Sequence, residues 1–205
     1  METYKFYFKH PARCIIAGPS CCGKTVFIQR IILHREYLFS VIPQRIIYTY
    51  VYEQEWFSDF PFVEFTKEIP QHLDASIPSI IVVDDIICDN SSVKQCASLF
   101  TRGSHHMNSS VFLLSQNLFL NSSFYRNISL NTNYFVLFKT KRGIAQIEHL
   151  ARQLFEQKLI KNFMEAYKTA TKNPFTYLVI DLETDQEFSL RSNIFPGEDE
   201  HIFLI

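Results

Sequence analysis

The octapeptide Gly18-Pro19-Ser20-Cys21-Cys22-Gly23-Lys24-Thr25 carries the strongest structural signal in this sequence. It matches the pattern G-x-x-x-x-G-K-S/T at every defined position. The apolar run Cys14–Ala17 precedes it, and the amphipathic stretch Lys24–Arg35 begins within it. We therefore predict a strand, a tight loop and a helix in this order, the arrangement in which such a loop binds phosphate groups.

Each part of the predicted phosphate-binding loop has a physical task. The backbone N–H groups of a compact loop turn inward, and the N-terminus of the following helix adds partial positive charge. Lys24 can reach the β- and γ-phosphates of a nucleotide, and the Thr25 hydroxyl can ligate Mg²⁺. Cys21 and Cys22 fill two unspecified positions. All residues of Gly18–Thr25 are candidate nucleotide-binding residues.

Short apolar runs alternate with longer helical patterns over the rest of the chain. Three runs are apolar at consecutive positions, namely Ile80–Val83, Val111–Leu114 and Phe135–Phe138. Strands of this kind must be covered on both faces, as in a parallel sheet with helices on each side. Further strands are predicted at Arg45–Val51, Tyr177–Leu182 and Glu187–Arg191, and further helices at Ser92–Arg102, Arg142–Phe155 and Lys158–Thr171.

The last two predicted strands are separated by the turn-like residues Glu183–Gln186. This pattern is typical of a β-hairpin, which would close one edge of the sheet. The sequence therefore predicts an α/β fold of the P-loop NTPase class, with a mostly parallel sheet flanked by helices. We expect one domain over residues 1–205, with the C-terminal hairpin and tail at about 174–205.

Two carboxylates follow the apolar run Ile80–Val83. In a P-loop fold this is the Walker B pattern, and the first acid, Asp84, would hold Mg²⁺ directly or through water. The second, Asp85, can orient or deprotonate an attacking water, or alternatively cap the following turn. At the position of Asp85, P-loop hydrolases more often have Glu, whose side chain is one methylene longer.

Other polar residues are candidates by their position in the predicted fold. Gln116 follows a core strand and can sense a γ-phosphate or hold the attacking water, or can simply be a polar residue leaving a strand. Arg102 can be an arginine finger that acts on a neighbouring subunit, or an ordinary helix-terminal residue before a glycine. Lys139, Lys141 and Arg142 form a basic cluster that suits either a solvated loop or a DNA-backbone contact.

Composition limits the class of protein. The 205 residues are 47% hydrophobic and 20% charged, which excludes disorder as the main state. Lys and Arg (20) nearly balance Asp and Glu (21), so bulk basicity gives no support to nucleic-acid binding. Five cysteines without a C-x-x-C pair favour a reducing compartment. No apolar stretch reaches the roughly 18 residues that span a bilayer, so we expect an intracellular protein without a membrane partner.

Five segments together resemble the genome-packaging ATPases of the FtsK–HerA superfamily, and in particular the poxvirus-like packaging ATPases of Maverick (Polinton) elements and related double-stranded DNA viruses. These segments are Gly18–Thr25, Ile80–Asp85, Phe100–His106, Ser110–Phe119 and Asn127–Asn131. The resemblance extends over nearly the whole chain.

The resemblance implies a RecA-like sheet in which another strand separates the Walker A and Walker B strands. It implies an ATP- and Mg²⁺-dependent ring of identical subunits that threads double-stranded DNA into a preformed capsid, with capsid or vertex proteins as partners, at the site of virus assembly in the host cell. By resemblance Lys24 and Thr25 bind phosphate and Mg²⁺, and Asp84 supports Mg²⁺. Asp85 takes the catalytic acid position, Gln116 is the sensor and Arg102 is the finger acting in trans.

Two other classes of protein fit the same loop. A nucleotide or nucleoside kinase is a P-loop fold of similar size, although the arginines after Gln116 are scattered and no lid insertion is evident. A nucleotide-switched binding module would hold a nucleotide without hydrolysing it. DNA-stimulated ATP hydrolysis would distinguish the motor from both.

Overall fold

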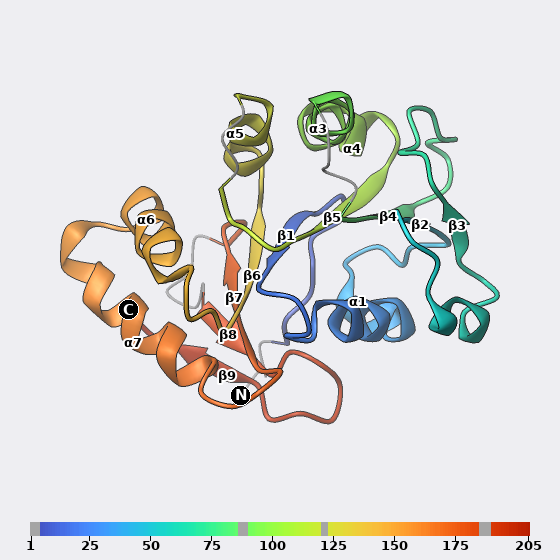
Figure 1. Ribbon diagram of the computed structural model, residues 1–205. Coiled ribbons are helices and arrows are strands. Elements are labelled where there is room, and N and C mark those ends of the chain that lie inside the picture. Colours follow the sequence, from blue (N-terminus) through green and yellow to red (C-terminus); the bar gives the residue numbers. More distant parts are fainter. Residues whose placement is uncertain (1–4, 86–89, 120–122, 185–189) are drawn as a thin grey trace.

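A nine-stranded sheet runs through the molecule in the order β3-β2-β4-β5-β1-β6-β7-β8-β9 (Figure 1). The computed structural model describes residues 5–85, 90–119, 123–184 and 190–205. The strands are β1 (Arg13–Ala17), β2 (Arg45–Thr49), β3 (Glu64–Thr66), β4 (Ser79–Asp84), β5 (Ser109–Ser115), β6 (Tyr134–Phe138), β7 (Tyr177–Asp181), β8 (Leu190–Ser192) and β9 (His201–Phe203).

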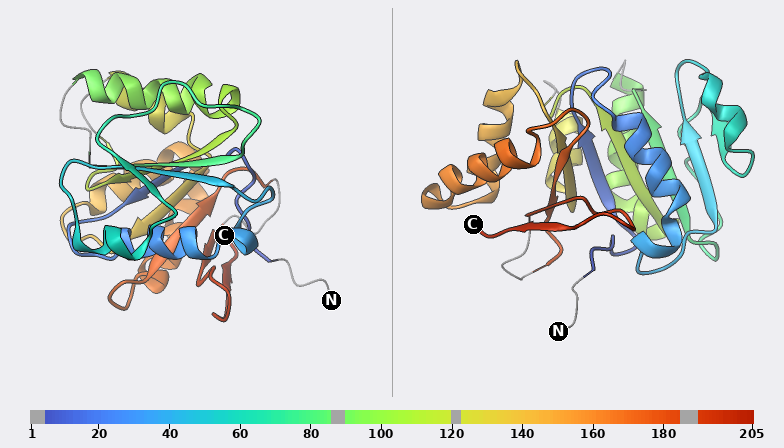
Figure 2. Two further views of the ribbon diagram at one scale, coloured as in Figure 1. Left: turned by 90° about the vertical axis from the view of Figure 1, so that its right-hand side faces the viewer. Right: turned by 90° about the horizontal axis from the view of Figure 1, so that it is seen from below.

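The sheet has a parallel part and an antiparallel part. The strands from β3 to β6 pair in parallel, whereas β7, β8 and β9 are each antiparallel to the preceding neighbour. Strand β5 separates β1 from β4, as the resemblance implied. The pairing of β7 with β8 confirms the predicted hairpin, and β9, which was not predicted, adds an outer strand to it (Figure 2). Residues 185–189, which include part of the predicted turn and of the predicted second strand, lie outside the described residues.

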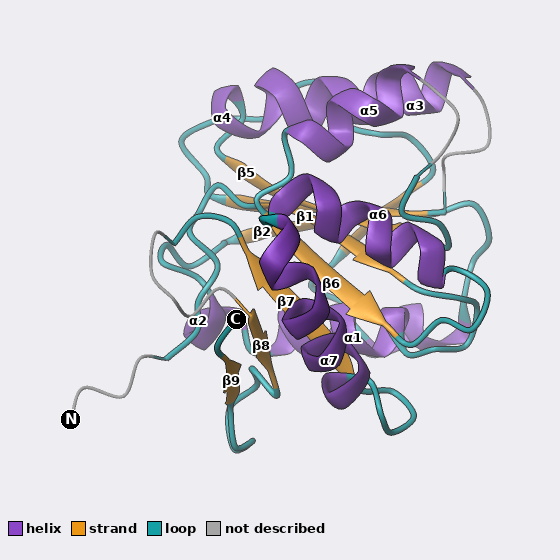
Figure 3. Cartoon of the chain, turned by 90° about the vertical axis from the view of Figure 1, so that its left-hand side faces the viewer, coloured by secondary structure: helices purple, strands orange, loops and turns teal. Residues whose placement is uncertain are grey.

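Helices cover both faces of the sheet (Figures 1 and 3). One face carries α1 (Lys24–Leu33), α2 (Arg35–Leu38) and the short helix η1 (Glu55–Asp59). The other carries α3 (Asn90–Ser98), η2 (Leu99–Gly103), α4 (Ser104–His106), α5 (Ser123–Leu130), α6 (Ile144–Leu154), η3 (Gln157–Leu159) and α7 (Ile160–Ala170). No helix in the described ranges is long and apolar enough to cross a bilayer.

The consecutive apolar positions explain the two-sided packing. Successive side chains of a strand point to opposite faces. In β4, Ile80 and Val82 join the core under α1, and Ile81 and Val83 join the core on the other face. All four are fully buried. A run without polar positions therefore requires helices on both sides of the sheet.

The predicted helices differ from the observed ones mainly at their ends. The helix expected at Ser92–Arg102 begins earlier as α3 and continues into η2, a π-helical turn that ends at Gly103. The helix expected at Lys24–Arg35 ends at Leu33. Helix α5 was not predicted.

Candidate functional site

The glycine-rich loop joins the carboxyl end of β1 to the start of α1. The Gly18 N–H donates a hydrogen bond to the Ser115 carbonyl (3.1 Å), which ties the loop to the end of β5. A Cβ at Gly18 would lie 2.7 Å from both Cys22 Sγ and Phe138 Cβ, so only glycine fits there. Gly23 caps α1 with a left-handed φ of 108°, which glycine adopts without a steric penalty. These two positions explain why the motif requires glycine.

The Lys24 side chain folds back over the loop. Its ammonium group donates hydrogen bonds to the carbonyls of Gly18 (2.7 Å) and Pro19 (3.0 Å), and the residue is only 8% exposed. Thr25, the next residue of α1, is half-buried. A cationic side chain and a hydroxyl group thus stand at the positive end of a ten-residue helix.

Asp84 ends β4 on the face that α1 covers. Alternation along the strand places Asp84 on the same face as Ile80 and Val82, which is the face of Lys24. Burial raises the pKa of Asp84, whereas hydrogen bonds from Tyr48 and Gln54 and the charge of Lys24 oppose this rise. The charge of Lys24 thus acts on the Asp84 carboxyl group.

Two donors meet one oxygen of Asp84, and neither was predicted from the sequence. The Tyr48 hydroxyl donates to Asp84 Oδ2 at 2.6 Å, and the Gln54 amide reaches the same oxygen at 3.4 Å. Burial and the neighbouring carboxylates raise the pKa of Tyr48, so its hydroxyl remains a donor. The sequence does hold a signal, because a tyrosine within a buried strand needs a partner for its hydroxyl.

Asp85 lies just beyond the strand. It is exposed and has a left-handed φ of 49°, a conformation that aspartate tolerates better than most residues. Because the ladder ends at Asp84, the Asp85 side chain is not committed to the face opposite Asp84. The two neighbouring acids therefore both stand at the carboxyl edge of the sheet.

Gln116 follows β5 directly and is exposed. Its backbone neighbour Ser115 is the residue that accepts the bond from Gly18, so Gln116 stands beside the loop. The Asn117 carbonyl after it accepts hydrogen bonds from the hydroxyls of Ser115 (2.7 Å) and Tyr125 (3.0 Å). These bonds hold the backbone around Gln116, the position predicted for a sensor.

Arg102 stands at the other edge of the sheet. It is exposed in η2, two residues after Phe100, whose carbonyl accepts a bond from the Arg13 guanidinium (3.3 Å). Arg13 begins β1 and Ala17 ends it, a distance of about 13 Å at roughly 3.3 Å per residue. Arg102 is thus separated from the loop of its own chain by the length of β1.

The basic cluster predicted after β6 lies against the loop. Lys139, Lys141 and Arg142 line a cleft of about 610 Å³ together with Pro19–Cys22 and the exposed Phe175. A smaller hollow of about 290 Å³ lies beside it, with walls that are mainly apolar. It is lined by Gly23, Val26, Phe27, Arg30, Phe138, Phe175, Tyr177 and Phe195. Phe175 borders both spaces.

The fold is similar to that of a solved viral protein. The genome packaging NTPase B204 from Sulfolobus turreted icosahedral virus 2, in complex with ATPγS, matches over 94% of this chain and 97% of its own, with a TM-score of 0.51 and 10% sequence identity. The same protein with sulfate and with AMPPCP gives TM-scores of 0.49 and 0.48. No family model and no curated protein matches the chain. The likeness confirms the predicted fold, an α/β P-loop NTPase architecture.

Proposed function

We propose that this protein is an ATP-hydrolysing motor that moves double-stranded DNA into a viral capsid. The observation that carries the proposal is the meeting of the Lys24 loop and Asp84 at the carboxyl edge of a P-loop sheet. The likeness to the fold of a viral genome packaging NTPase supports the same function. The segments that resemble packaging ATPases of the FtsK–HerA type, including Phe100–His106, support the finer assignment.

The donor set suits a magnesium nucleotide. A hydroxyl and a carboxylate are ligands that Mg²⁺ takes beside phosphate oxygens and water, and Thr25 and Asp84 would supply them. When bound, Mg²⁺ supplies positive charge that offsets the charge of the phosphates. Lys24 would exchange its two bonds to loop carbonyls for bonds to phosphate oxygens, so its ammonium group stays hydrogen-bonded in both states.

The remaining parts of a nucleotide have space beside the loop. The ribose and base would lie over Phe175, between the cleft and the apolar hollow that it borders. An aromatic ring offers a stacking surface for a base, and Lys141 and Arg142 offer charge to the phosphate end.

Hydrolysis requires groups that act on the attacking water and on the developing charge. Asp85 would orient the water or accept its proton, and Gln116 would sense the γ-phosphate. Because Arg102 is at the edge remote from its own loop, it would serve the site of a neighbouring subunit in a homo-oligomeric ring. Capsid or vertex proteins would anchor this ring at the site of virus assembly in the host cell.

The deciding experiment measures ATP turnover with and without double-stranded DNA, alongside the mass in solution. The motor predicts turnover that rises with duplex DNA of any sequence and falls as salt is added, because the contacts are to phosphates. Turnover that instead requires a nucleotide acceptor would identify a kinase. ATP binding without turnover would identify a switched module.

Two variants assign the catalytic roles. Asp85→Asn should retain ATP binding and lose hydrolysis, and unchanged turnover would remove Asp85 from the mechanism. Arg102→Ala subunits should be mixed into wild-type rings in increasing proportion. Activity that falls more steeply than the wild-type fraction supports a finger acting in trans, and a proportional fall argues against one.

A further inference from the structure

The carboxylate of Asp84 is held by side chains from a different part of the chain. Tyr48 belongs to β2, which pairs in parallel with β4 so that Tyr48 lies opposite Val82. Tyr48, Val82 and Asp84 therefore share one face of the sheet, and the Tyr48 hydroxyl reaches Asp84 Oδ2 at 2.6 Å. Gln54, from the segment after β2, reaches the same oxygen. Among the described residues none donates to Oδ1, the second oxygen of this carboxylate.

The Tyr48 ring cannot easily move away. It is fully buried, and three rings pack around it: Trp56 at 5.2 Å, Phe57 at 5.8 Å and Phe65 at 5.8 Å between ring centroids. Such packing fixes the rotamer, so the hydroxyl is directed at Asp84 before any ligand binds.

Gln54 is fixed in turn by the single tryptophan of the chain. The Trp56 indole N–H donates to Gln54 Oε1 at 2.7 Å, which directs the Gln54 amide N–H₂ toward Asp84. A hydrogen-bonded chain thus runs from the indole through the amide to the carboxylate. It begins in η1, which lies between β2 and the outer strand β3 in the sequence.

We infer that Tyr48 and Gln54 are positioning residues that hold one oxygen of Asp84 so that the other faces the metal of a bound magnesium nucleotide. The inference rests on the proposed nucleotide binding and adds to it the two residues that orient the metal carboxylate. Hydrogen-bond partners of metal ligands commonly change metal affinity by 10- to 100-fold. The same chain connects the metal site with Trp56, which makes its fluorescence a reporter of the loaded state.

The experiment compares ATPγS binding in Mg²⁺ with binding in EDTA for the full-length protein. Tyr48→Phe removes only the hydroxyl. The ratio of ATPγS affinity in Mg²⁺ to ATPγS affinity in EDTA should fall about 10-fold in this variant, and the affinity in EDTA should not change. Tyr134→Phe is the matched control, because Tyr134 is a buried tyrosine of the same core whose hydroxyl bonds the Lys9 N–H instead. It should behave as the wild type.

A second variant guards against a folding defect in Tyr48→Phe. Gln54 is only half-buried in its loop, and Gln54→Met removes the donor at similar side-chain length. Its bond to Asp84 is the longer one, so we expect a smaller loss of the Mg²⁺ effect, about three-fold, in the direction of Tyr48→Phe. In the wild type, Trp56 emission should change on adding ATPγS with Mg²⁺ and change less with ATPγS in EDTA.

The outcomes separate the two proposals. A wild-type protein that binds no ATPγS in either condition overturns the proposed function together with this inference. Mg²⁺ could strengthen ATPγS binding by the wild type and, within two-fold, strengthen it equally in Tyr48→Phe and Gln54→Met. That result would overturn the inference and leave the proposed function standing. Loss of ATPγS affinity in EDTA to the same extent as in Mg²⁺ also overturns it, because the role of Tyr48 would then be structural.

Discussion

The two edges of the parallel sheet carry different kinds of polar network. At the carboxyl edge, Lys24 bonds backbone carbonyls of its own loop, and Asp84 receives both described donors on one oxygen. These groups are held in place by bonds that leave acceptor or donor capacity for a ligand. Asp85 and Gln116 stand exposed beside them.

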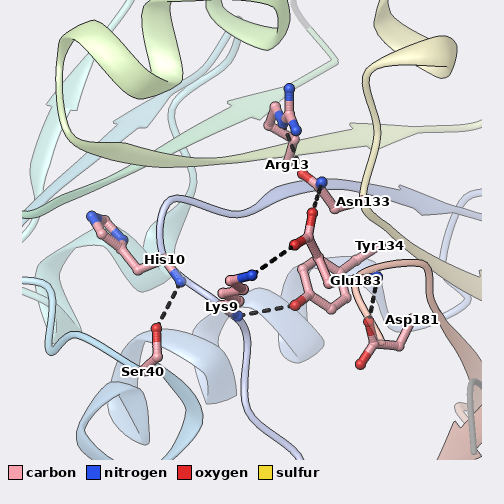
Figure 4. A network of polar contacts seen from close by, with 8 residues as sticks. All are labelled: Lys9, His10, Arg13, Ser40, Asn133, Tyr134, Asp181 and Glu183. Atoms are coloured by element: carbon pink, nitrogen blue, oxygen red, sulfur yellow. Dashed lines mark hydrogen bonds and ion pairs between the residues drawn. The ribbon is translucent and has the colours of Figure 1, made fainter. Parts of the chain in front are cut away.

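At the amino edge, charged and neutral polar side chains bond one another (Figure 4). The Arg13 guanidinium donates to Asn133 Oδ1 at 2.7 Å, and the Asn133 amide donates to Glu183. Lys9 forms an ion pair with Glu183 at 3.5 Å, and its backbone N–H donates to the Tyr134 hydroxyl at 3.0 Å. These contacts connect the N-terminal segment to β1, β6 and the end of β7.

The contrast separates a site from a structural network. A cluster of charged residues does not by itself indicate function, because the amino edge carries one as well. The difference is in the partners: Arg13, Asn133, Lys9 and Glu183 use one another, whereas in the described part of the chain Lys24 bonds two carbonyls of its own loop and Asp84 accepts bonds on one oxygen. Variants at matched positions on the two edges therefore test the distinction.

The largest effect is expected for the two lysines. On the proposed function, Lys24→Ala should lower ATP turnover by about 10²–10³-fold, because it removes the cation that would face the transferring phosphoryl group. Lys9→Ala should leave turnover unchanged. Turnover and ATPγS affinity measured on both variants, with circular dichroism to establish folding, check the expectation. Equal losses from the two substitutions would remove the distinction between the edges.

Glycines provide the next comparison. Gly18→Ala places a methyl group 2.7 Å from Cys22 Sγ and Phe138 Cβ, and should lower the free energy of unfolding by about 1–3 kcal/mol. ATPγS affinity should fall with it, because the loop must shift. Gly103→Ala on the other edge places a methyl group 2.9 Å from the flexible end of Met107, 3.2 Å from Leu99 Cδ2 and 3.3 Å from the Ser98 carbonyl oxygen, in a right-handed helical conformation. Urea denaturation should therefore show a smaller change for Gly103→Ala, and a larger one would contradict the packing argument.

The sequence predicted the parts of the site that are local in the chain. The Gly18–Thr25 loop and the pair Asp84 and Asp85 were found because their chemistry depends on residues adjacent in sequence. The long apolar runs predicted the parallel sheet because burial of both faces leaves no polar position. The expectation that the Gly18–Thr25 loop and the two aspartates lie close together followed from the fold class alone, since P-loop folds bring the carboxyl ends of β1 and β4 together.

The rest depended on contacts between distant segments. Tyr48 reaches Asp84 only through the register of β2 against β4, which a periodic pattern does not reveal. The short strand β9 has three residues, too few for a clear alternation. The position of Lys139–Arg142 against the loop follows from the pairing of β6 with β1. For Tyr48 and for Lys139–Arg142, the pairing of the strands, rather than residue type, was the missing information.

A smaller effect is expected from pH on the free energy of unfolding, through His10 at the amino edge. The His10 Nε2 faces two acceptors of Asn108, its carbonyl (3.1 Å) and Oδ1 (3.0 Å), and Nδ1 faces the Ser110 hydroxyl (2.8 Å). Burial lowers the pKa of His10, although the Asn108 bonds oppose this. The folded state thus favours the neutral ring. The stability that His10 contributes should be present above about pH 6.5 and be lost as the pH falls through the lowered value.

Urea unfolding at pH 5.5, 6.5 and 7.5 tests this expectation. The difference in midpoint between the wild type and His10→Asn should shrink as the pH falls. The same substitution at the exposed His72 is the control for effects that do not depend on the surroundings of His10. A His10 difference that grows toward low pH would mean that the charged ring is the stabilised form and that the Asn108 bonds outweigh burial.

The smallest effect is expected for the ion pair between Lys9 and Glu183. The two side chains are 67% and 30% exposed, so water and salt screen their attraction. A double-mutant cycle with Lys9→Met and Glu183→Gln should give a coupling of about 0.2–1 kcal/mol, which declines when salt is raised from 0.1 M to 1 M. Turnover should not change in any member of the cycle. A salt-insensitive coupling above about 2 kcal/mol, or altered turnover, would show that the amino edge does more than join the N-terminal segment to the sheet.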